Sequence, residues 1–236
     1  MVDLASEMAQ LWGSLRPPPK GQARVVQFVA ARGGEGTSTV AREFARYAAR
    51  RVRRPVWLID LDLMQSPQSD AIAAQSGLYG PLGRQAAASP DGSTFFTVQP
   101  PSRGRDGRVA SDARYLIAYP VGGPKLWVTR FRRELLHVGQ SVHVVPNPRY
   151  WNALRRHADV IVVDAPAADR SKAALTIAPF VDYSVLVVAA DEGDAAGPAA
   201  LKAAIIAAKG RCAGLVFNRA VAAAPSFLQR LLPDPQ

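Results

Sequence analysis

The stretch AARGGEGTSTV, residues 30–40, decides the fold of this chain. It follows RVVQFVAA (24–31), a largely apolar run that predicts a buried strand. It leads into TSTVAREFARYAARRV (37–52), in which apolar residues recur at helical spacing. A second apolar run, VWLI (56–59), comes after Pro55. Strand, glycine-rich loop, helix and strand in this order predict a βαβ unit.

The loop in this stretch has the composition of a phosphate-binding loop. Gly33, Gly34 and Gly36 let backbone N–H groups approach and surround a phosphate. Ser38 and Thr39 stand where the helix begins, and a hydroxyl at that place binds Mg²⁺ or caps the helix. The helix N-terminus adds its own partial positive charge. The stretch therefore predicts a nucleotide site.

Two residues break the strict pattern G-x-x-x-x-G-K-[ST]. Ala31 replaces the first glycine, and Thr37 stands at the lysine position. A charge-assisted contact is worth roughly 1.5–3 kcal/mol, so we expect nucleotide affinity to fall by about one to two orders of magnitude. The alternative interpretation is a tight strand-to-helix turn without a ligand, capped by Ser38 or Thr39.

Three aspartates follow predicted strands. Asp60 and Asp62 come at the end of the second strand, and Asp164 ends another apolar run, VIVV (160–163). Ligands of open α/β sheets bind at this carboxyl edge. Carboxylates there suit magnesium or general-base chemistry, although any single aspartate is more often a helix cap or a turn residue. The three together with a glycine loop favour a site.

The second half of the chain repeats the alternation of strand and helix. After the run at 160–163, we expect a helix over 171–180, a strand over 183–190, a helix over 195–210 and a strand over 213–217. Apolar strands that alternate with helices predict an α/β fold with a mostly parallel sheet and helices on both faces.

The composition divides the chain into three parts, the second of which contains a distinct segment. Residues 1–23 predict a helix and a proline-rich connector, 24–220 the main domain, and 221–236 a tail. Within the domain, residues 76–150 are rich in Gly, Pro and Ser, and we interpret them as an insertion or an elaborated edge. Strands are expected there over 94–98, 115–119 and 126–131, and a short helix over 130–139.

The charge is basic and uneven. The net charge is +10, and residues 76–157 hold 12 Lys+Arg against 4 Asp+Glu. Such a surface attracts nucleic acid, anionic lipid or an acidic partner, although solvated arginines of no specific role explain it equally well.

Compartment and membrane association are indicated by what the sequence lacks. Cys212 is the single cysteine, the first residues lack a secretory signal pattern, and no apolar run approaches ~18 residues. We expect a cytoplasmic protein, with peripheral attachment at the inner membrane as an alternative.

Five segments carry a resemblance to a known family: GEGTSTVAREFA (34–45), VWLIDLDL (56–63), ADVIVVDAP (158–166), IAPFVDYSVLVVAADEG (177–193) and GLVFNR (214–219). They resemble the deviant Walker A P-loop ATPases of the ParA/MinD type. Within these, they are most similar to the cytoplasmic domain of the bacterial tyrosine kinases (BY-kinases) that regulate exopolysaccharide synthesis. The resemblance implies a P-loop NTPase-like fold.

The resemblance also implies roles for residues of this sequence, with ATP and Mg²⁺ as ligands. Asp60 and Asp62 are the implied catalytic residues if the protein is active, and Ser38, Asp62 and Asp164 the implied metal ligands. The implied nucleotide-binding residues are Arg32, Gly33, Gly34, Glu35, Gly36, Thr37, Ser38, Thr39 and Asn218.

Several positions depart from the family pattern. Thr37 replaces the loop lysine of the kinases, whereas Arg32 stands where ParA-type proteins carry a signature lysine. The kinases carry a C-terminal tyrosine cluster, but Tyr183 is the last tyrosine here. The kinases have an N-terminal motif of the form E-x-x-R-x-x-R. In this chain Gln10 and Gly13 follow Glu7, so both arginines of the motif are absent. A protein that does not autophosphorylate needs none of these features.

The sequence therefore favours a catalytically impaired, kinase-like P-loop protein. We expect it to be a pseudo-kinase or pseudo-ATPase that regulates or scaffolds exopolysaccharide synthesis or export. Its expected partner is a membrane polysaccharide co-polymerase or export protein, and homodimerisation is a further expectation.

Two alternatives remain open. One is a ParA/MinD-like positioning ATPase that binds DNA or an anionic membrane surface, DNA being the less favoured ligand. The other is a working ATPase or tyrosine kinase whose cation comes from Lys20, Lys125, Lys172 or Lys202.

Overall fold

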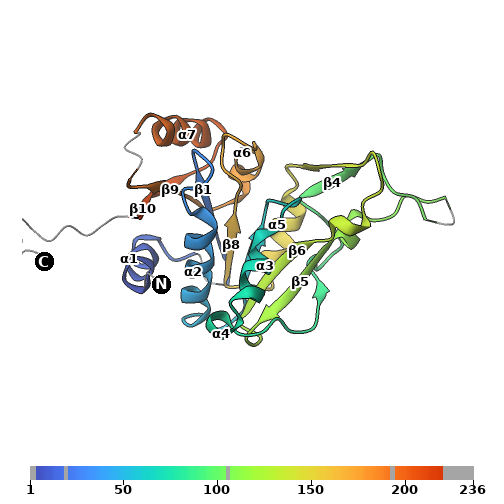
Figure 1. Ribbon diagram of the computed structural model, residues 1–236, viewed down its shortest axis with the longest axis horizontal. Helices are drawn as coiled ribbons and strands as arrows, with labels where there is room; N and C mark the ends of the chain where they lie inside the picture. Colours follow the sequence, from blue (N-terminus) through green and yellow to red (C-terminus); the bar gives the residue numbers. More distant parts are fainter. Residues whose placement is uncertain (1–3, 19–20, 105–106, 192–194, 220–236) are drawn as a thin grey trace, which may run out of the picture.

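The computed structural model describes residues 4–18, 21–104, 107–191 and 195–219. Its centre is an eight-stranded sheet with the strand order β10-β9-β1-β8-β2-β6-β5-β3 (Figure 1). Neighbouring strands from β10 to β6 are parallel, and β5 and β3 are antiparallel additions. The strands are β1 (Arg24–Ala30), β2 (Val56–Asp60), β3 (Ala86–Ala87), β5 (Leu116–Val121), β6 (Leu126–Phe131), β8 (Val160–Asp164), β9 (Tyr183–Ala189) and β10 (Cys212–Asn218). The predicted α/β fold is confirmed.

Helices cover both faces of the sheet, as the sequence predicts. On one face lie α1 (Ala5–Ser14), α2 (Thr37–Ala49) and α3 (Pro67–Ala74), with α4 (Ser76–Tyr79) following α3. On the other face lie α5 (Pro148–Arg155), α6 (Ala173–Ile177) and α7 (Ala196–Ala207). None of the described helices is long and apolar enough to cross a membrane.

Strand β1 shows why a largely apolar run forms the centre of such a sheet. All seven of its residues are buried. Because side chains alternate across a strand, Val25 and Val29 belong to the cluster under α5 and α7, whereas Val26 and Phe28 pack against α2. Both faces of β1 are therefore mainly apolar, and its buried Gln27 donates from Nε2 to the Ser184 hydroxyl at 2.9 Å.

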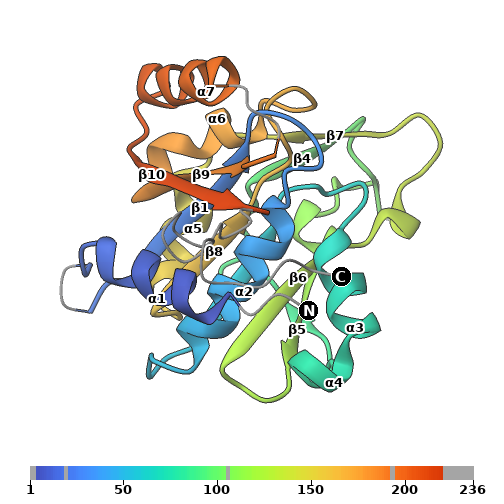
Figure 2. The same ribbon diagram turned by 60° about the vertical axis from the view of Figure 1, so that its left-hand side comes forward.

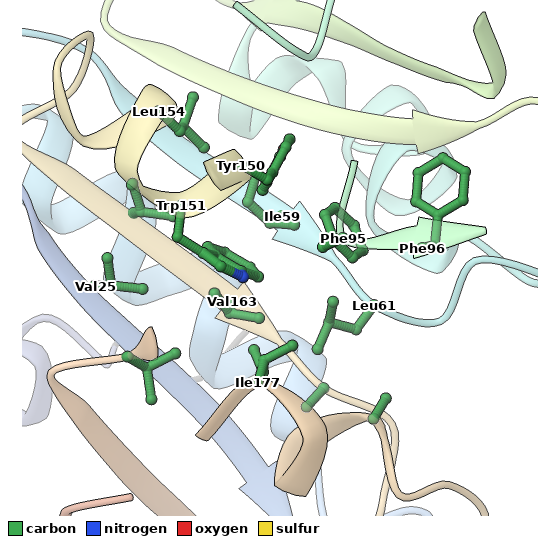
Figure 3. Close-up of a cluster of buried hydrophobic side chains, with 14 of the residues drawn as sticks. Val25, Ile59, Leu61, Phe95, Phe96, Tyr150, Trp151, Leu154, Val163 and Ile177 are labelled. Atoms are coloured by element: carbon green, nitrogen blue, oxygen red, sulfur yellow. The ribbon is translucent and has the colours of Figure 1, made fainter. Parts of the chain in front are cut away.

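The cluster beneath α5 is strongly aromatic. Tyr150 and Trp151 of α5 are fully buried against Ile59 and Val163 of neighbouring strands (Figure 3). Phe95 lies with its ring centroid 4.9 Å from that of Tyr150 and 5.5 Å from that of Trp151. Each such ring removes a large apolar area from water, so this cluster anchors α5 to the carboxyl half of the sheet.

Residues 76–150 extend the main sheet at one edge. Strand β6 pairs in parallel with β2, and β5 and β3 follow it. Strands β4 (Phe96–Gln99) and β7 (Ser141–Val144) form a separate two-stranded sheet. The three strands expected in this segment exist, each within two residues of its predicted bounds. The domain boundary near residue 220 stays a prediction, and the tail at 221–236 lies outside the described residues.

The short helix expected over 130–139 is wrong. Residues 130 and 131 belong to β6, where cross-strand pairing with β5 holds them extended. What remains is a 3₁₀ turn, η2 (Arg133–Leu135). Two further 3₁₀ turns are η1 (Asp112–Tyr115) and η3 (Ala178–Phe180).

Among the elements that the sequence analysis missed are the helices α3 and α5 and the strand β7. Both helices begin with a proline in their first turn, and Asn147 caps α5 by accepting a hydrogen bond from Arg149 N at 3.1 Å. A proline after a capping residue is a helix start signal, so α5 could have been found from the sequence.

Helix α1 packs on the outside of α2 (Figure 1 and Figure 2). Met8 is buried, and the ring of Trp12 lies 6.0 Å from that of Phe44. The guanidinium of Arg24 sits 4.9 Å from the Trp12 ring centroid. The N-terminal helix is therefore packed against the body of the molecule.

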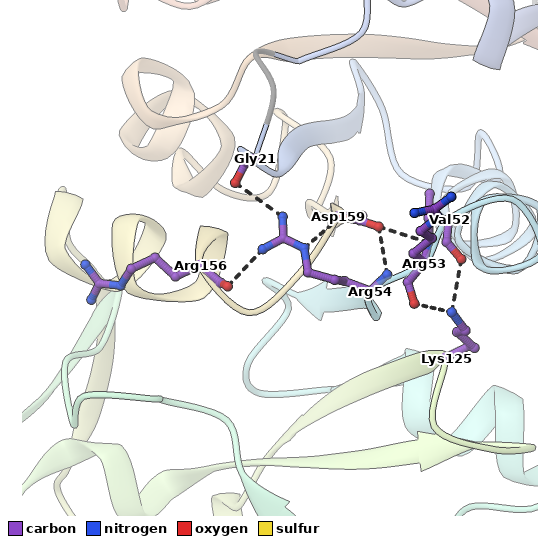
Figure 4. Close-up of polar contacts among 7 residues, drawn as sticks. All are labelled: Gly21, Val52, Arg53, Arg54, Lys125, Arg156 and Asp159. Carbon is purple, nitrogen blue, oxygen red and sulfur yellow. Dashed lines mark hydrogen bonds and ion pairs between the residues drawn. The ribbon is translucent and has the colours of Figure 1, made fainter.

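A polar cluster links the segments that precede β2 and β8, at the edge of the sheet where the parallel strands begin (Figure 4). The carboxylate of Asp159 accepts hydrogen bonds from the backbone N–H groups of Arg53 and Arg54 and from Arg54 Nε at 2.7 Å. Arg54 also donates to the carbonyls of Arg156 and Gly21. These contacts fix the starts of β2 and β8 beside each other, and thereby the register that brings Asp60 next to Asp164.

Candidate functional site

The glycine loop between β1 and α2 is held in one conformation by distant parts of the chain. Gly36 is the N-cap of α2, with φ at 88°, and Asn218 at the end of β10 donates from Nδ2 to the Glu35 carbonyl at 3.0 Å. A Cβ atom on Gly36 would lie 1.9 Å from that Nδ2 atom. Asn218, expected to recognise a nucleotide base, therefore supports the loop in this structure, and base recognition stays a prediction.

Two carboxylates brace the same loop, Glu35 from inside the protein and Asp169 from the surface. The buried carboxylate of Glu35 accepts from the backbone N–H groups of Arg32 at 2.9 Å and Ala189 at 3.4 Å. Asp169, which follows β8, accepts from Gly33 N at 3.1 Å. Glu35 is thus a structural part of the loop, and its side chain faces the sheet.

Next to the loop lies a cavity of about 290 Å³ at the carboxyl edge of the parallel strands. It brings together most of the predicted site residues. Those that line it are Arg32, Gly33, Gly34, Gly36, Thr37, Ser38, Thr39, Asp62 and Asp164. Glu35, Asp60 and Asn218 do not line it.

Asp164 is the residue of this cavity with an unsatisfied atom. Its carboxylate is 3% exposed, and Oδ2 accepts from Gln68 Nε2 at 2.7 Å. Oδ1 is buried and has no hydrogen-bond partner among the described residues. Burial raises the pKa of Asp164 to about 6, against the hydrogen bonds from Gln68 and the Ser38 hydroxyl, which lower it. An open, desolvated carboxylate oxygen beside a hydroxyl suits a hard cation such as Mg²⁺.

Asp60 points into the protein rather than into the cavity. Its Oδ1 accepts from Asp62 N and its Oδ2 from Gln68 N, both at 3.0 Å. It is 2% exposed and is the register partner of Asp164 on the adjacent strand. Burial and the Asp164 carboxylate raise the pKa of Asp60 well above its usual range. Asp60 therefore shapes the turn from β2 into α3.

Asp62, in contrast, faces the cavity. Its side chain is 19% exposed, and Oδ1 accepts from Gln65 N at 3.3 Å. Its Oδ2 lies 3.8 Å from a guanidinium nitrogen of Arg170. Of the two aspartates predicted to be catalytic, Asp62 is the one placed to meet a ligand.

Gln68 was missed by the sequence analysis, although it organises the site. It is completely buried, and its Nε2 donates to both Asp164 Oδ2 and the Ser38 carbonyl. Its Oε1 accepts from Arg42 Nη1 at 3.0 Å. Arg42 of α2 is itself buried and donates from Nε to the Tyr79 hydroxyl. Only the packing of α2 against α3 brings these residues together.

Three of the lysines considered as replacements for the loop lysine lie among the described residues, and none of these three lines the loop cavity. Lys125 donates to the carbonyls of Val52 and Arg53, at the amino edge of the sheet, so its assignment is wrong (Figure 4). Lys172 lines an adjoining cavity of about 460 Å³. Lys202 lies on α7, in a groove along β9 and β10. Lys20 lies outside the described residues.

The fold is that of bacterial tyrosine-kinase domains. The kinase domain of VpsO aligns with a TM-score of 0.55 and 19% identity, over 92% of this chain and 95% of that one. The kinase domain of the Escherichia coli tyrosine kinase ETK also gives 0.55, with 15% identity over 93% and 76%. A cobyrinic acid a,c-diamide synthase from Mycobacterium smegmatis, with bound ADP and magnesium, gives 0.49, with 14% identity over 82% and 72%.

The sequence comparisons are negative. No family model matches the chain, and no curated protein matches it. The two kinase domains are only 19% and 15% identical to this chain, so their structural similarity establishes its fold alone. The chain thus has the fold of the kinase domains of VpsO and ETK.

Proposed function

We propose that this chain is a kinase-like P-loop protein that binds a magnesium nucleotide weakly and is impaired in phosphoryl transfer. The observation that carries the proposal is a cavity lined both by Asp164, whose buried Oδ1 has no partner among the described residues, and by a glycine loop that has Thr37 at the lysine position. The fold supports it, since two bacterial tyrosine-kinase domains share the architecture.

Each part of the cavity has a role in this proposal. The backbone N–H groups of Gly34 and Gly36 hold phosphate oxygens, because α2 begins there and its first N–H groups lack helical partners. Ser38, Asp62 and Asp164 hold Mg²⁺, which neutralises phosphate charge when it is bound. Asp62 remains the candidate base.

The missing lysine explains the impairment. Phosphoryl transfer depends on positive charge that stabilises the transition state, and a threonine hydroxyl supplies none. The buried Thr37 sits at the start of α2 in contact with the cavity. Binding survives through backbone N–H groups and the metal, whereas efficient transfer does not.

The biological role in this proposal is regulation or scaffolding of exopolysaccharide synthesis or export, at the cytoplasmic face of a membrane polysaccharide co-polymerase. The support is the kinase-type fold, together with the loss of the loop lysine, the tyrosine cluster and the arginine pair. Affinity purification of the tagged protein from membranes of the organism that encodes it, followed by mass spectrometry, tests this role. Absence of any polysaccharide-pathway membrane protein would contradict it.

The nucleotide part is tested by calorimetric titration with Mg-ATP and by phosphate release. We expect weak binding by the wild type, binding about tenfold to hundredfold tighter by Thr37→Lys, and negligible turnover by the wild type. Wild-type turnover of about 1 per second or faster, as in working kinases, would overturn the proposed impairment.

A further inference from the structure

We propose that Arg170 supplies the positive charge that faces the nucleotide phosphates in this protein. This inference rests on the proposed function, because it concerns the same cavity. Arg170 lines the loop cavity and also the adjoining cavity, so it stands in the wall between the two. No motif pointed to it, since it lies on the loop six residues beyond Asp164.

The backbone that carries Arg170 is firmly placed against the start of the glycine loop. Ala168 N donates to the Ala30 carbonyl at 2.9 Å, and Asp169 N donates to the Ala31 carbonyl at 3.2 Å. Asp169 also accepts from Gly33 N. The segment after β8 therefore continues the hydrogen bonding between β8 and β1 beyond the ends of the two strands. These bonds fix the position of the backbone from which the Arg170 side chain extends.

The side chain of Arg170 runs over the loop. Its Cδ and Nε lie 3.9 and 3.8 Å from the point that a Cβ of Gly33 would occupy, which is van der Waals distance. Its guanidinium then comes within 3.8 Å of Asp62 Oδ2. Arg170 thus reaches along the cavity wall from the glycine loop to Asp62, two residues after the end of β2.

The guanidinium of Arg170 has N–H donors that are available to a phosphate. It presents five N–H donors, and a 3.8 Å ion pair is longer than a hydrogen bond. Apart from this pair, no described residue gives the Arg170 side chain a polar contact. The side chain is 50% exposed, so it can turn toward a ligand at little cost. A planar guanidinium also matches two phosphate oxygens at once.

The charge balance of the cavity also favours a movement of the Arg170 guanidinium from Asp62 toward the phosphates of a ligand. Without a ligand, Arg170 lies beside Asp62. When Asp62 and Asp164 hold a divalent cation, their negative charge is compensated, and the phosphates become the stronger partner for the guanidinium. Arg170 is therefore held near Asp62 until a magnesium nucleotide enters.

Calorimetric titration with Mg-ADP tests this inference without any dependence on turnover. The variants are Arg170→Gln, Arg170→Lys and Arg32→Gln, because Arg32 also lines the cavity. Arg50→Gln is the matched control: Arg50 is exposed at the far end of the 13-residue α2, about 20 Å from the loop. We expect Arg170→Gln to weaken binding by about tenfold to hundredfold and Arg170→Lys by less. Arg50→Gln should have no effect.

Wild-type affinity in Arg170→Gln, or a loss confined to Arg32→Gln, overturns the inference and leaves the proposed function standing. All variants are repeated with Thr37→Lys added. If the wild type fails to bind Mg-ADP but Thr37→Lys binds, the proposed weak binding by the wild type is wrong. Arg170 is then tested by adding Arg170→Gln to Thr37→Lys, and a loss of affinity of less than about tenfold overturns its proposed role. If neither protein binds, both proposals fall. Circular dichroism confirms that each variant is folded, which the exposure of Arg170 leads us to expect.

Discussion

The amide of Asn218 occupies the space that a side chain at Gly36 would need, with Nδ2 only 1.9 Å from the position of a Cβ atom. The two residues are 182 positions apart in the chain and meet because β10 ends beside the glycine loop. The glycine is thus required by a tertiary contact as well as by its positive φ of 88°. The glycine loop of this protein is thus supported from behind by an asparagine.

The first prediction separates these two requirements. Gly34→Ala faces the strain of a positive φ of 89° with nothing within 4 Å, and should cost about 1–2 kcal/mol. Gly36→Ala meets the same strain and also displaces Asn218, so its cost should be clearly larger. Urea unfolding of both variants measures the difference. Adding Asn218→Ala to Gly36→Ala should recover part of the loss, and equal costs for the two alanine variants would contradict the contact.

A second prediction concerns the buried Gln68. Gln68→Met keeps the size of the side chain but removes its hydrogen bonds to Asp164, the Ser38 carbonyl and Arg42. Because buried partners are left unsatisfied, we expect a loss of about 3 kcal/mol in the free energy of unfolding. The control is Gln75→Met at the exposed end of α3, with an expected change below about 0.5 kcal/mol. Similar stabilities for the two variants would show that the network is dispensable.

A third prediction concerns pH and the cluster at Asp159. Burial alone would raise the pKa of Asp159, but hydrogen bonds from Arg54 and Arg53 outweigh it and lower the pKa overall. A lowered pKa means that the stabilisation is present above the unfolded value of about 3.9 and is lost as pH falls through the folded value. The side chain is 26% exposed, so solvent limits the effect to about 1 kcal/mol.

The measurement for Asp159 is urea unfolding of the wild type and Asp159→Asn between about pH 7 and pH 3. The stability difference should be constant near neutral pH and shrink below about pH 4, where the wild-type carboxylate takes up a proton. Glu7→Gln, on the exposed surface of α1, serves as the control without such contacts. A difference that grows on acidification would refute the assigned direction of the pKa shift.

The fold was largely predictable because its signals are local. The buried strands at β1, β2, β8 and β9 are largely apolar runs, and the glycine loop separates the first of them from an amphipathic helix. The middle segment was harder, since β6 joins the main sheet by pairing with β2, and paired residues such as Leu58 and Val128 are 70 positions apart in the chain. The helix expected over 130–139 failed for the same reason: strand pairing overrode its local helical preference.

By itself, the sequence determined the strand–loop–helix unit, the aspartates at the strand ends and the threonine at the lysine position, because each depends on residues close together in the chain. Only the tertiary structure decided which of these groups face the cavity. The strand order sets β8 between β1 and β2, so Asp60 and Asp164 lie side by side; the turn after β2 satisfies both oxygens of Asp60, whereas Oδ1 of Asp164 has no partner among the described residues. The same order carries Arg170 across Gly33 and places Asn218 behind Gly36, since the ends of parallel strands meet at one edge whatever their separation in sequence.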